Sequence, residues 1–258
     1  MKFALETRAG RPAAMEFAER LAVEIGEHGS EVVTDPETAP DAVIAVGGDG
    51  TMLAAVRRSM AWDVPVLGFN LGTLGFLTEA EASELKPVVA HLVQGDFDVE
   101  ERMTLSATIE GVSAYGVNDV VVEKIDTTRL VNLEVVVDGS PFTTYRADGL
   151  VIATPTGSTA YSFSAGGPLV APGVAVIVMT PVASHSLFDR SLVLPDSSTI
   201  DVIVNRDRQV KVHVDKSDLG ELGEGETVRI ERGDRPAKFV SFGASSFPSV
   251  VRDKFGLD

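Results

Sequence analysis

The sequence predicts two domains, a parallel α/β domain over residues 1–97 and a domain built mostly of β-strands over residues 98–242. Two observations support this division. Before Gly95, apolar strand-like runs alternate with segments of helical periodicity, and each strand leads into a glycine-rich turn. Beyond Gly95, short runs of β-branched residues alternate with turn signals such as Asp138-Gly139.

The elements of the first domain follow from the spacing of its apolar residues. Steps of three and four residues predict helices at residues 12–28, 51–60 and 81–93. Continuous apolar runs predict strands at residues 42–46 and 64–69. The first strand leads into Gly47-Gly48-Asp49-Gly50 and the second into a glycine-containing turn at 70–76, so the domain contains two strand, turn and helix units.

The second domain contains strand-like runs and one helical segment. Strands are predicted at residues 104–110, 117–123, 132–137, 150–153, 174–180, 198–205 and 209–214. A helix is predicted at residues 158–165. The sequence shows no internal repeat.

The chain is strongly acidic. Its 258 residues include 38 Asp and Glu against 22 Lys and Arg, a net charge of −16. This charge repels nucleic acid and anionic lipid surfaces, so we expect no nucleic-acid partner and no membrane partner. Only seven of the basic residues are lysines, and an acidic, lysine-poor chain is typical of proteins adapted to high salt. The alternative is an ordinary acidic cytosolic protein.

The sequence lacks cysteine, a signal peptide and a membrane-spanning stretch, which limits the expected cellular location and the possible chemistry. The sequence contains no cysteine, which excludes a disulfide framework, a cysteine nucleophile and thiolate metal sites. Charged residues are spread over the first 21 residues, so no signal peptide is expected. The longest apolar stretch, residues 168–183, is too short and too interrupted by proline to span a bilayer. We therefore expect a cytoplasmic protein.

The turn Gly47-Gly48-Asp49-Gly50-Thr51 stands where a predicted strand meets a predicted helix. At such a place glycines let a phosphate approach the backbone, and the helix offers unpaired N–H groups. Asp49 would repel a phosphate unless it contacts a metal or takes a proton from a hydroxyl group. The alternative is a tight turn in which Asp49 caps the helix. The turn alone leaves both interpretations open.

Two common phosphate-binding motifs are missing. No glycine-rich loop ends in Lys-Ser or Lys-Thr, which excludes the P-loop. The dinucleotide fingerprint GxGxxG is not matched either, because Leu53 stands at the position of the third glycine.

A second polar segment covers residues 148–168 and contains Thr154-Pro155-Thr156-Gly157-Ser158-Thr159-Ala160-Tyr161. Its hydroxyl groups and glycines supply many hydrogen-bonding groups with little bulk, so the segment can surround a polar ligand. A strand followed by a capped helix would account for Ser158 and Gly166 on structural grounds, but not for the whole run.

Other polar residues interrupt apolar runs. Asn118 and Asp119 are poor β formers within a predicted strand, so they either cap a strand end at the surface or face a site together. Asp215 taken alone favours a turn. His185 taken alone favours a hydrogen-bonded structural residue, because neither a Ser/His/Asp order nor a His-x-x-x-His spacing accompanies it.

Taken together, these segments resemble the NAD kinase family. Lipid kinases of the diacylglycerol and sphingosine type and 6-phosphofructokinases carry turns similar to residues 47–51, whereas the run DGLVIATPTGSTAYSFSAGGP at 148–168 is specific to NAD kinases. Further matches lie at residues 70–76, 118–119, 184–195 and 214–215. The chain departs from many members in having Asp119 where they have Glu, and Lys216 where they have Gly.

The resemblance implies a Rossmann-like N-terminal α/β domain, a β-sandwich-like C-terminal domain, and a tail at 243–258 that completes the first domain. It implies transfer of a phosphoryl group from ATP or polyphosphate to the 2′-hydroxyl of the adenosine ribose of NAD. A divalent metal, Mg²⁺, would come with ATP rather than sit in a dedicated protein cage. A homodimer or homotetramer with shared active sites is also implied.

The resemblance further implies a role for each matched residue. Asp49 would be the general base, with Gly50 beside it, and Gly47, Gly48 and Asp215 would lie in the phosphate and metal region. The residues at the adenosine end of NAD would be Phe76, Asn118, Asp119, Ser158, Thr159, Ala160 and Tyr161. Those at the nicotinamide half would be Asp148, Ser164, Ala183 and His185, some of them from a neighbouring subunit.

Two other functions are compatible with the same turn. In a lipid kinase it would act on a membrane substrate, but no basic or amphipathic membrane-binding segment is evident. In a non-catalytic NAD sensor the same pocket would bind NAD without turnover, and the intact Asp49 argues against this.

Overall fold

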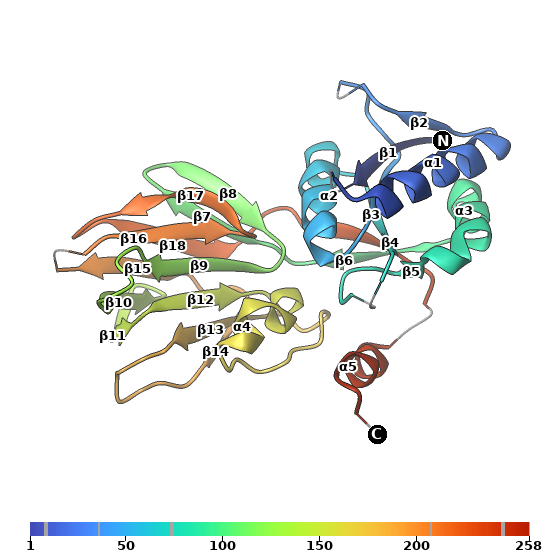
Figure 1. Cartoon of the computed structure of the whole chain (residues 1–258). Coiled ribbons are helices and arrows are strands. Elements are labelled where there is room, and N and C mark those ends of the chain that lie inside the picture. Colours follow the sequence, from blue (N-terminus) through green and yellow to red (C-terminus); the bar gives the residue numbers. More distant parts are fainter. Residues whose placement is uncertain (8–9, 36, 73–74, 207, 244–245, 258) are drawn as a thin grey trace. The chain divides into compact units, whose positions relative to one another are not determined.

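The computed structural model describes residues 1–7, 10–35, 37–72, 75–206, 208–243 and 246–257 (Figure 1). The chain forms two compact units, Met1–Glu101 with Ala237–Asp258, and Arg102–Pro236. These bounds differ from the predicted 97 and 242 because β6 (Asp98–Arg102) and β19 (Ala237–Ser241) are strands of the first unit's sheet. Part of the predicted turn at 70–76 and part of the tail at 243–258 lie outside the described residues.

The described part of the first unit contains a seven-stranded sheet. Its strands follow the order β2 (Glu31–Val33), β1 (Lys2–Thr7), β3 (Ala42–Val46), β4 (Val66–Asn70), β19 and β6, with β5 (Ala80–Glu81) also paired to β4. The pairs from β2 to β19 are parallel. All five residues of β3 are buried, because helices cover both faces of a parallel sheet.

Helices lie on both faces of this sheet (Figure 1). On one face, α1 (Pro12–Glu27) and α3 (Leu85–Gln94) pack against the strands through a core that includes Phe17, Phe69 and Leu92. On the other face, α2 (Asp49–Trp62) approaches so closely that a Cβ at Gly68 would meet Met52 Sδ at 2.7 Å. The three predicted helices are confirmed, although the third begins as the 3₁₀ turn η1 (Ala82–Glu84).

The second unit, in its described part, consists of two six-stranded antiparallel sheets. One has the order β11 (Ser140–Ala147), β10 (Val131–Val137), β15 (Ile200–Asn205), β18 (Thr227–Arg232), β7 (Leu105–Ile109) and β8 (Val112–Gly116). The other has the order β14 (Leu192–Pro195), β13 (Val176–Val182), β12 (Gly149–Ala153), β9 (Asp119–Lys124), β16 (Val210–Val214) and β17 (Ser217–Leu222). Tyr145, Leu133, Leu150 and Met179 form a core from both sheets, which confirms the predicted sandwich.

The prediction of one continuous helix at 158–165 is wrong, because the structure has two short helical turns there. The segment contains the 3₁₀ turn η2 (Thr156–Thr159) and the single turn α4 (Tyr161–Ser164). Ala160 lies between them with φ −98° and ψ −126°, outside the helical region, and therefore interrupts the helix. In the part of the chain that the structure describes, no helix has the length and apolar character needed to cross a membrane.

Candidate active site

The acidic turn lies at the carboxyl edge of the first sheet, where β3 ends beside β1 and the strand order reverses. Gly47 has a φ of 152°, and a Cβ there would meet Thr51 Oγ1 at 2.6 Å, so glycine is required. Gly48 is the N-cap of α2 and Asp49 is its first residue. The alternative in which Asp49 caps the helix is therefore wrong. Its carboxylate still lies in the first turn, where the helix dipole favours negative charge.

A second segment packs onto the carboxylate of Asp49. The backbone N–H of Leu77 donates to Asp49 Oδ1 at 3.4 Å. A Cβ at Gly75 would lie 2.2 Å from the same oxygen, so only glycine fits beside it. Phe76 lies between these two residues and is half-buried, with its ring 6.2 Å from that of Phe255. Two residues predicted separately, Asp49 and Phe76, therefore belong to segments that contact each other through Gly75 and Leu77. Gly75 itself was not predicted as a site residue, because its importance depends on this contact between distant segments.

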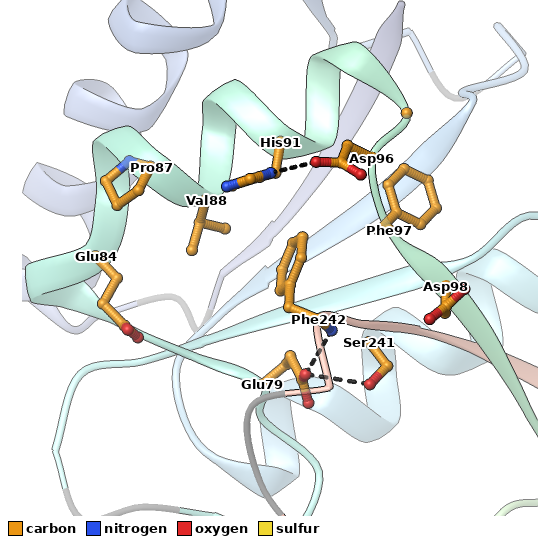
Figure 2. A pocket seen from close by; sticks show the side chains of 11 residues that line it. Glu79, Glu84, Pro87, Val88, His91, Asp96, Phe97, Asp98, Ser241 and Phe242 are labelled. Atoms are coloured by element: carbon orange, nitrogen blue, oxygen red, sulfur yellow. Dashed lines mark hydrogen bonds and ion pairs between the residues drawn. The ribbon is translucent and has the colours of Figure 1, made fainter.

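The same segment continues to Glu79, which fixes its far end (Figure 2). Glu79 Oε1 accepts hydrogen bonds from Phe242 N at 2.7 Å and from Ser241 Oγ at 3.2 Å, both at the end of β19. Figure 2 shows these contacts beside a hollow of about 470 Å³ that α3 also lines. Residues 75–79 are thus attached at one end to Asp49 and at the other to β19.

In the second unit, the buried carboxylate of Asp215 holds the start of β9. It accepts backbone hydrogen bonds from Val117 at 2.7 Å, Asn118 at 2.8 Å and Asp119 at 3.2 Å. Asp215 occupies a left-handed turn with φ 47°, as the favoured turn interpretation requires. The turn also fixes the backbone at residues 117–119, because the carboxylate of Asp215 accepts hydrogen bonds from three converging N–H groups. The placement near phosphate and metal stays a prediction.

Residues 154–157 also contact the backbone at residues 117–118. Thr154 N donates to Asn118 O at 2.9 Å, and Thr154 Oγ1 donates to Val117 O at 2.5 Å. A Cβ at Gly157 would lie only 1.9 Å from Asn118 O. The two backbone segments are therefore so close that no side chain fits at residue 157. Asn118 and Asp119 are both buried. They do not cap a strand at the surface, and the interpretation that they face a site together is favoured.

Asp119 has an unusual electrostatic environment. It is 6% exposed, and burial, followed by the nearby charge of Asp215, raises its pKa to about 7. The backbone of Tyr161 hydrogen-bonds to Asp119 and opposes this rise. Burial also raises the pKa of the Tyr161 phenol, with further contributions from the charges of Glu123, Asp148 and Asp119. The negative charge of Glu123 therefore helps to raise the pKa of the Tyr161 phenol, although the sequence pattern indicated only that Glu123 ends a strand.

The remaining residues predicted for the adenosine end differ in their accessibility. Ser158 is fully buried, and its hydroxyl donates to Val170 O at 3.2 Å and accepts from Val170 N at 2.9 Å. Its side chain holds a loop and offers a ligand no exposed surface. Thr159 Oγ1 donates to Thr156 O at 3.0 Å. Thr159 and Ala160 are half-buried, and Tyr161 is exposed, so these three keep surface for a ligand.

Of the four residues predicted for the nicotinamide half, Asp148, Ala183 and His185 lie at the opposite end of the β9–β12 pair. Asp119 pairs with Ala153, whereas Asp148 precedes Gly149 at the other end of β12, about 17 Å away along the strand. Asp148 forms an ion pair with Lys124. The exposed residues Ala183 and His185 follow β13 at the same end, and His185 N donates to Arg146 O at 2.8 Å. Ser164 is exposed at the end of α4.

The described residues contain no group of three or more His, Asp or Glu side chains that could hold a metal ion.

Comparisons with known proteins cover both units. Residues 18–97 match the ATP-NAD kinase N-terminal domain and residues 117–242 match the ATP-NAD kinase C-terminal domain. Both matched domains are parts of kinases, so the chain is an enzyme of the phosphotransferase class. It belongs to the NAD kinase family.

The individual relatives agree with this. An NAD kinase of Moorella thermoacetica is 40% identical over 91% of this chain and 77% of its own length. One of Thermococcus sibiricus is 36% identical over 99% of this chain and 100% of its own length. The structure is similar to that of an Archaeoglobus fulgidus NAD kinase in complex with ATP, with TM-score 0.81, 25% identity and coverage of 100% of this chain and 98% of that one. A yeast NADH kinase complexed with NADH shares the fold at TM-score 0.91 and 24% identity, over 100% and 88% of the two chains.

Proposed function

We propose that the protein transfers the γ-phosphoryl group of ATP to the 2′-hydroxyl of the adenosine ribose of NAD. The observation that supports this most is the position of Asp49. Its carboxylate lies in the first turn of α2, beside glycines that let phosphates approach the backbone, and it is held by the N–H of Leu77. A carboxylate among groups that favour anions suits a site where an alcohol loses its proton to become a nucleophile.

In the proposed reaction, Asp49 accepts the proton of the 2′-hydroxyl as the ribose oxygen bonds to the γ-phosphorus. The bond from this phosphorus to the bridging oxygen breaks, and ADP leaves with that electron pair. ATP enters with Mg²⁺, which as part of the substrate reduces the charge of the donor phosphates. Polyphosphate would offer the same type of phosphoryl group, and we propose it as an alternative donor.

The adenosine end of NAD is proposed to bind the loop that Asp215 and Thr154 hold. Asn118 can both donate to and accept from adenine or ribose, and ionised Asp119 can accept from ribose hydroxyls. Tyr161, which is exposed beside this loop, supplies an aromatic face for the base. Asp215 acts as a positioning residue, since three backbone N–H groups of this loop converge on it.

A direct test offers the purified protein three mixtures: NAD with MgATP, diacylglycerol vesicles with MgATP, and NAD with polyphosphate in place of ATP. We expect NADP in the first mixture, detected with an NADP-specific dehydrogenase. Phosphorylation of the lipid alone would favour a lipid kinase. Binding of NAD without any turnover would favour a sensor. Either result would overturn the proposal.

The affinity for NAD is expected to depend on pH through Asp119, whose pKa is about 7. Below pH 7 the carboxyl group becomes mostly neutral and loses part of its acceptor capacity, so the KM for NAD should rise as the pH falls below 7. Because the folded state binds this proton more tightly than the unfolded state, Asp119 also makes the free protein less stable as pH rises from about 4 to about 7.

Asp119→Asn should therefore flatten the KM profile. Its melting temperature relative to the parent should increase from pH 5 to pH 8. Parallel KM profiles in the two proteins, together with a constant difference in melting temperature, would show that Asp119 does not titrate in this range.

We propose a homodimer or homotetramer that shares the segment at 184–193 between subunits. Leu187 is 108% exposed, and Phe188 and Val193 are 40% and 49% exposed, which is a large apolar surface for one short segment. Leu187→Glu should shift sedimentation toward smaller species and lower the turnover number at equal chain concentration. A fully active monomer of the parent at assay concentration would contradict this.

We propose adaptation to a salt-rich cytoplasm from the net charge of −16. Near-molar KCl shortens the Debye length to about 3 Å, so repulsion among carboxylates falls and the melting temperature should rise. NaCl at the same ionic strength should act similarly. Equal melting temperatures in low and molar salt would remove this proposal and leave the kinase proposal intact.

A further inference from the structure

In the described part of the second unit, three hairpin turns share one backbone conformation, and one of them carries lysine where the other two carry glycine. Each turn joins paired strands through two residues of positive φ. The turns are Glu110-Gly111 with φ 48° and 82°, Asp138-Gly139 with 50° and 74°, and Asp215-Lys216 with 47° and 66°. Glycine suits the second position because it has no Cβ to clash with the backbone.

Lys216 therefore holds a left-handed backbone conformation that costs folding free energy for any residue with a Cβ. It is also the position at which this chain departs from the many NAD kinases that have glycine. Backbone strain of this kind is found most often where a side chain has a function. The structure thus directs attention to what the side chain of Lys216 does.

The turn that contains Lys216 is bonded directly to the backbone of Asp119. Asp215 N donates to Asp119 O at 3.0 Å, and Asp119 N donates to Asp215 Oδ1 at 3.2 Å. The pairing of Val214 with Val120 continues this contact into the sheet. Lys216 follows Asp215 in the chain, so it lies at the end of β9 where the adenosine end of NAD is proposed to bind.

The ammonium group of Lys216 acts on Asp119 without being bound by it. Asp119 and Asp215 are buried, whereas Lys216 is exposed. In the part of the chain that the structure describes, this ammonium group forms no ion pair and no hydrogen bond. Its charge lowers the pKa of Asp119, against the larger effects of burial and of the Asp215 charge, which raise it. The hydrogen-bond donors of Lys216 are therefore left for a ligand beside Asp119.

The chemistry of that ligand follows from the proposed function, on which this inference rests. NAD brings a neutral 2′-hydroxyl to Asp119, whereas NADP brings a phosphate with about two negative charges on the same oxygen. The carboxylates of Asp119 and Asp215 repel such a phosphate, and an ammonium group with three N–H donors offsets the repulsion. We propose that Lys216 distinguishes NADP from NAD by donating hydrogen bonds to the phosphate on the 2′-oxygen.

The test is calorimetric titration of NADP and, separately, of NAD into the full-length parent, Lys216→Met and Lys216→Gly at constant KCl. A pH of about 8 keeps Asp119, whose pKa is about 7, mainly ionised. Both variants should bind NADP roughly tenfold more weakly than the parent, the usual effect of losing a hydrogen bond to a charged group. Their affinity for NAD should stay close to that of the parent.

The matched control is Lys211→Met on the same hairpin. Lys211 pairs with Asp218 at 2.7 Å, and its backbone lies opposite Glu123 toward the other end of β9. This variant removes the same charge as Lys216→Met, and it should bind both nucleotides as the parent does.

Melting temperatures test the strain separately from the binding. Lys216→Gly should melt above Lys216→Met, because both lack the charge and only Met keeps a Cβ in the left-handed conformation. If Lys216→Gly melts below Lys216→Met, the turn is not strained by its lysine and the premise of the proposal is wrong.

Three binding results would overturn the proposal while leaving the proposed function intact. These are unchanged NADP binding in Lys216→Met, equal weakening of NAD and NADP in that variant, and the same loss of NADP binding in Lys211→Met. A parent protein that binds neither nucleotide would overturn the proposed function, and this inference with it.

Discussion

Asp49→Asn is expected to lower the turnover number by roughly 10²–10⁴-fold, the range typical of losing a general base, while NAD still binds. Asn has the same size as Asp, and its amide oxygen can still accept the hydrogen bond that Leu77 N donates. The helix loses only the favourable contact between an acidic first turn and its dipole, about 0.3–1 kcal/mol. The variant should therefore fold and melt close to the parent.

The matched control is Asp63→Asn at the opposite end of α2. Asp63 is the left-handed C-cap, a conformation that Asn also adopts readily, and it pairs with Lys238 at 2.8 Å. This control should keep the parent rate. If Asp49→Asn melts normally and still forms NADP within a few-fold of the parent rate, the assignment of the base is wrong, and Asp119 and Asp215 become the next candidates.

Gly157→Ala is expected to lower the affinity for NAD at least tenfold and to destabilise the protein by about 1–3 kcal/mol, the usual cost of overpacking. The new Cβ would lie 1.9 Å from Asn118 O, so one of two backbone segments must move. Asn118 is fixed on its other side by Asp215, so the movement would displace the loop proposed to hold adenosine.

Gly173→Ala is the matched control, because a Cβ at Gly173 meets nothing within 4 Å. It should leave both melting temperature and NAD affinity unchanged. The binding of ATP, which involves the first unit in this account, should survive in Gly157→Ala. An unchanged KM for NAD in Gly157→Ala would show that the loop at residue 118 does not hold the substrate.

Much of the fold was predictable because buried strands carry continuous or alternating apolar runs. The strand predicted at 42–46 matches β3 residue for residue. The strands β8, β11, β14 and β17, by contrast, are the edges of the two sandwich sheets and are largely exposed, so their sequences show little hydrophobic pattern. β19 was missed as part of the first sheet because its pairing with β4 joins distant parts of the chain.

The candidate site was predictable where function demands unusual residues in one short segment, as at 47–51 and 154–161. Contacts between distant segments were not predictable. Asp215 meets the backbone at 117–119 across more than ninety residues of sequence, and its isolated pattern indicated only a turn. Ser158 fits a ligand-binding pattern, yet its hydroxyl is engaged by Val170.

The central claim is that this chain phosphorylates the 2′-hydroxyl of the adenosine ribose of NAD. The most direct measurement is ³¹P NMR of the product formed from NAD and MgATP, with the Asp49→Asn variant run in parallel. The account predicts one new phosphomonoester resonance, coupled to the ribose 2′-hydrogen, that appears with the parent and is nearly absent with the variant. A monoester at another position, or consumption of ATP with NAD unchanged, would contradict it.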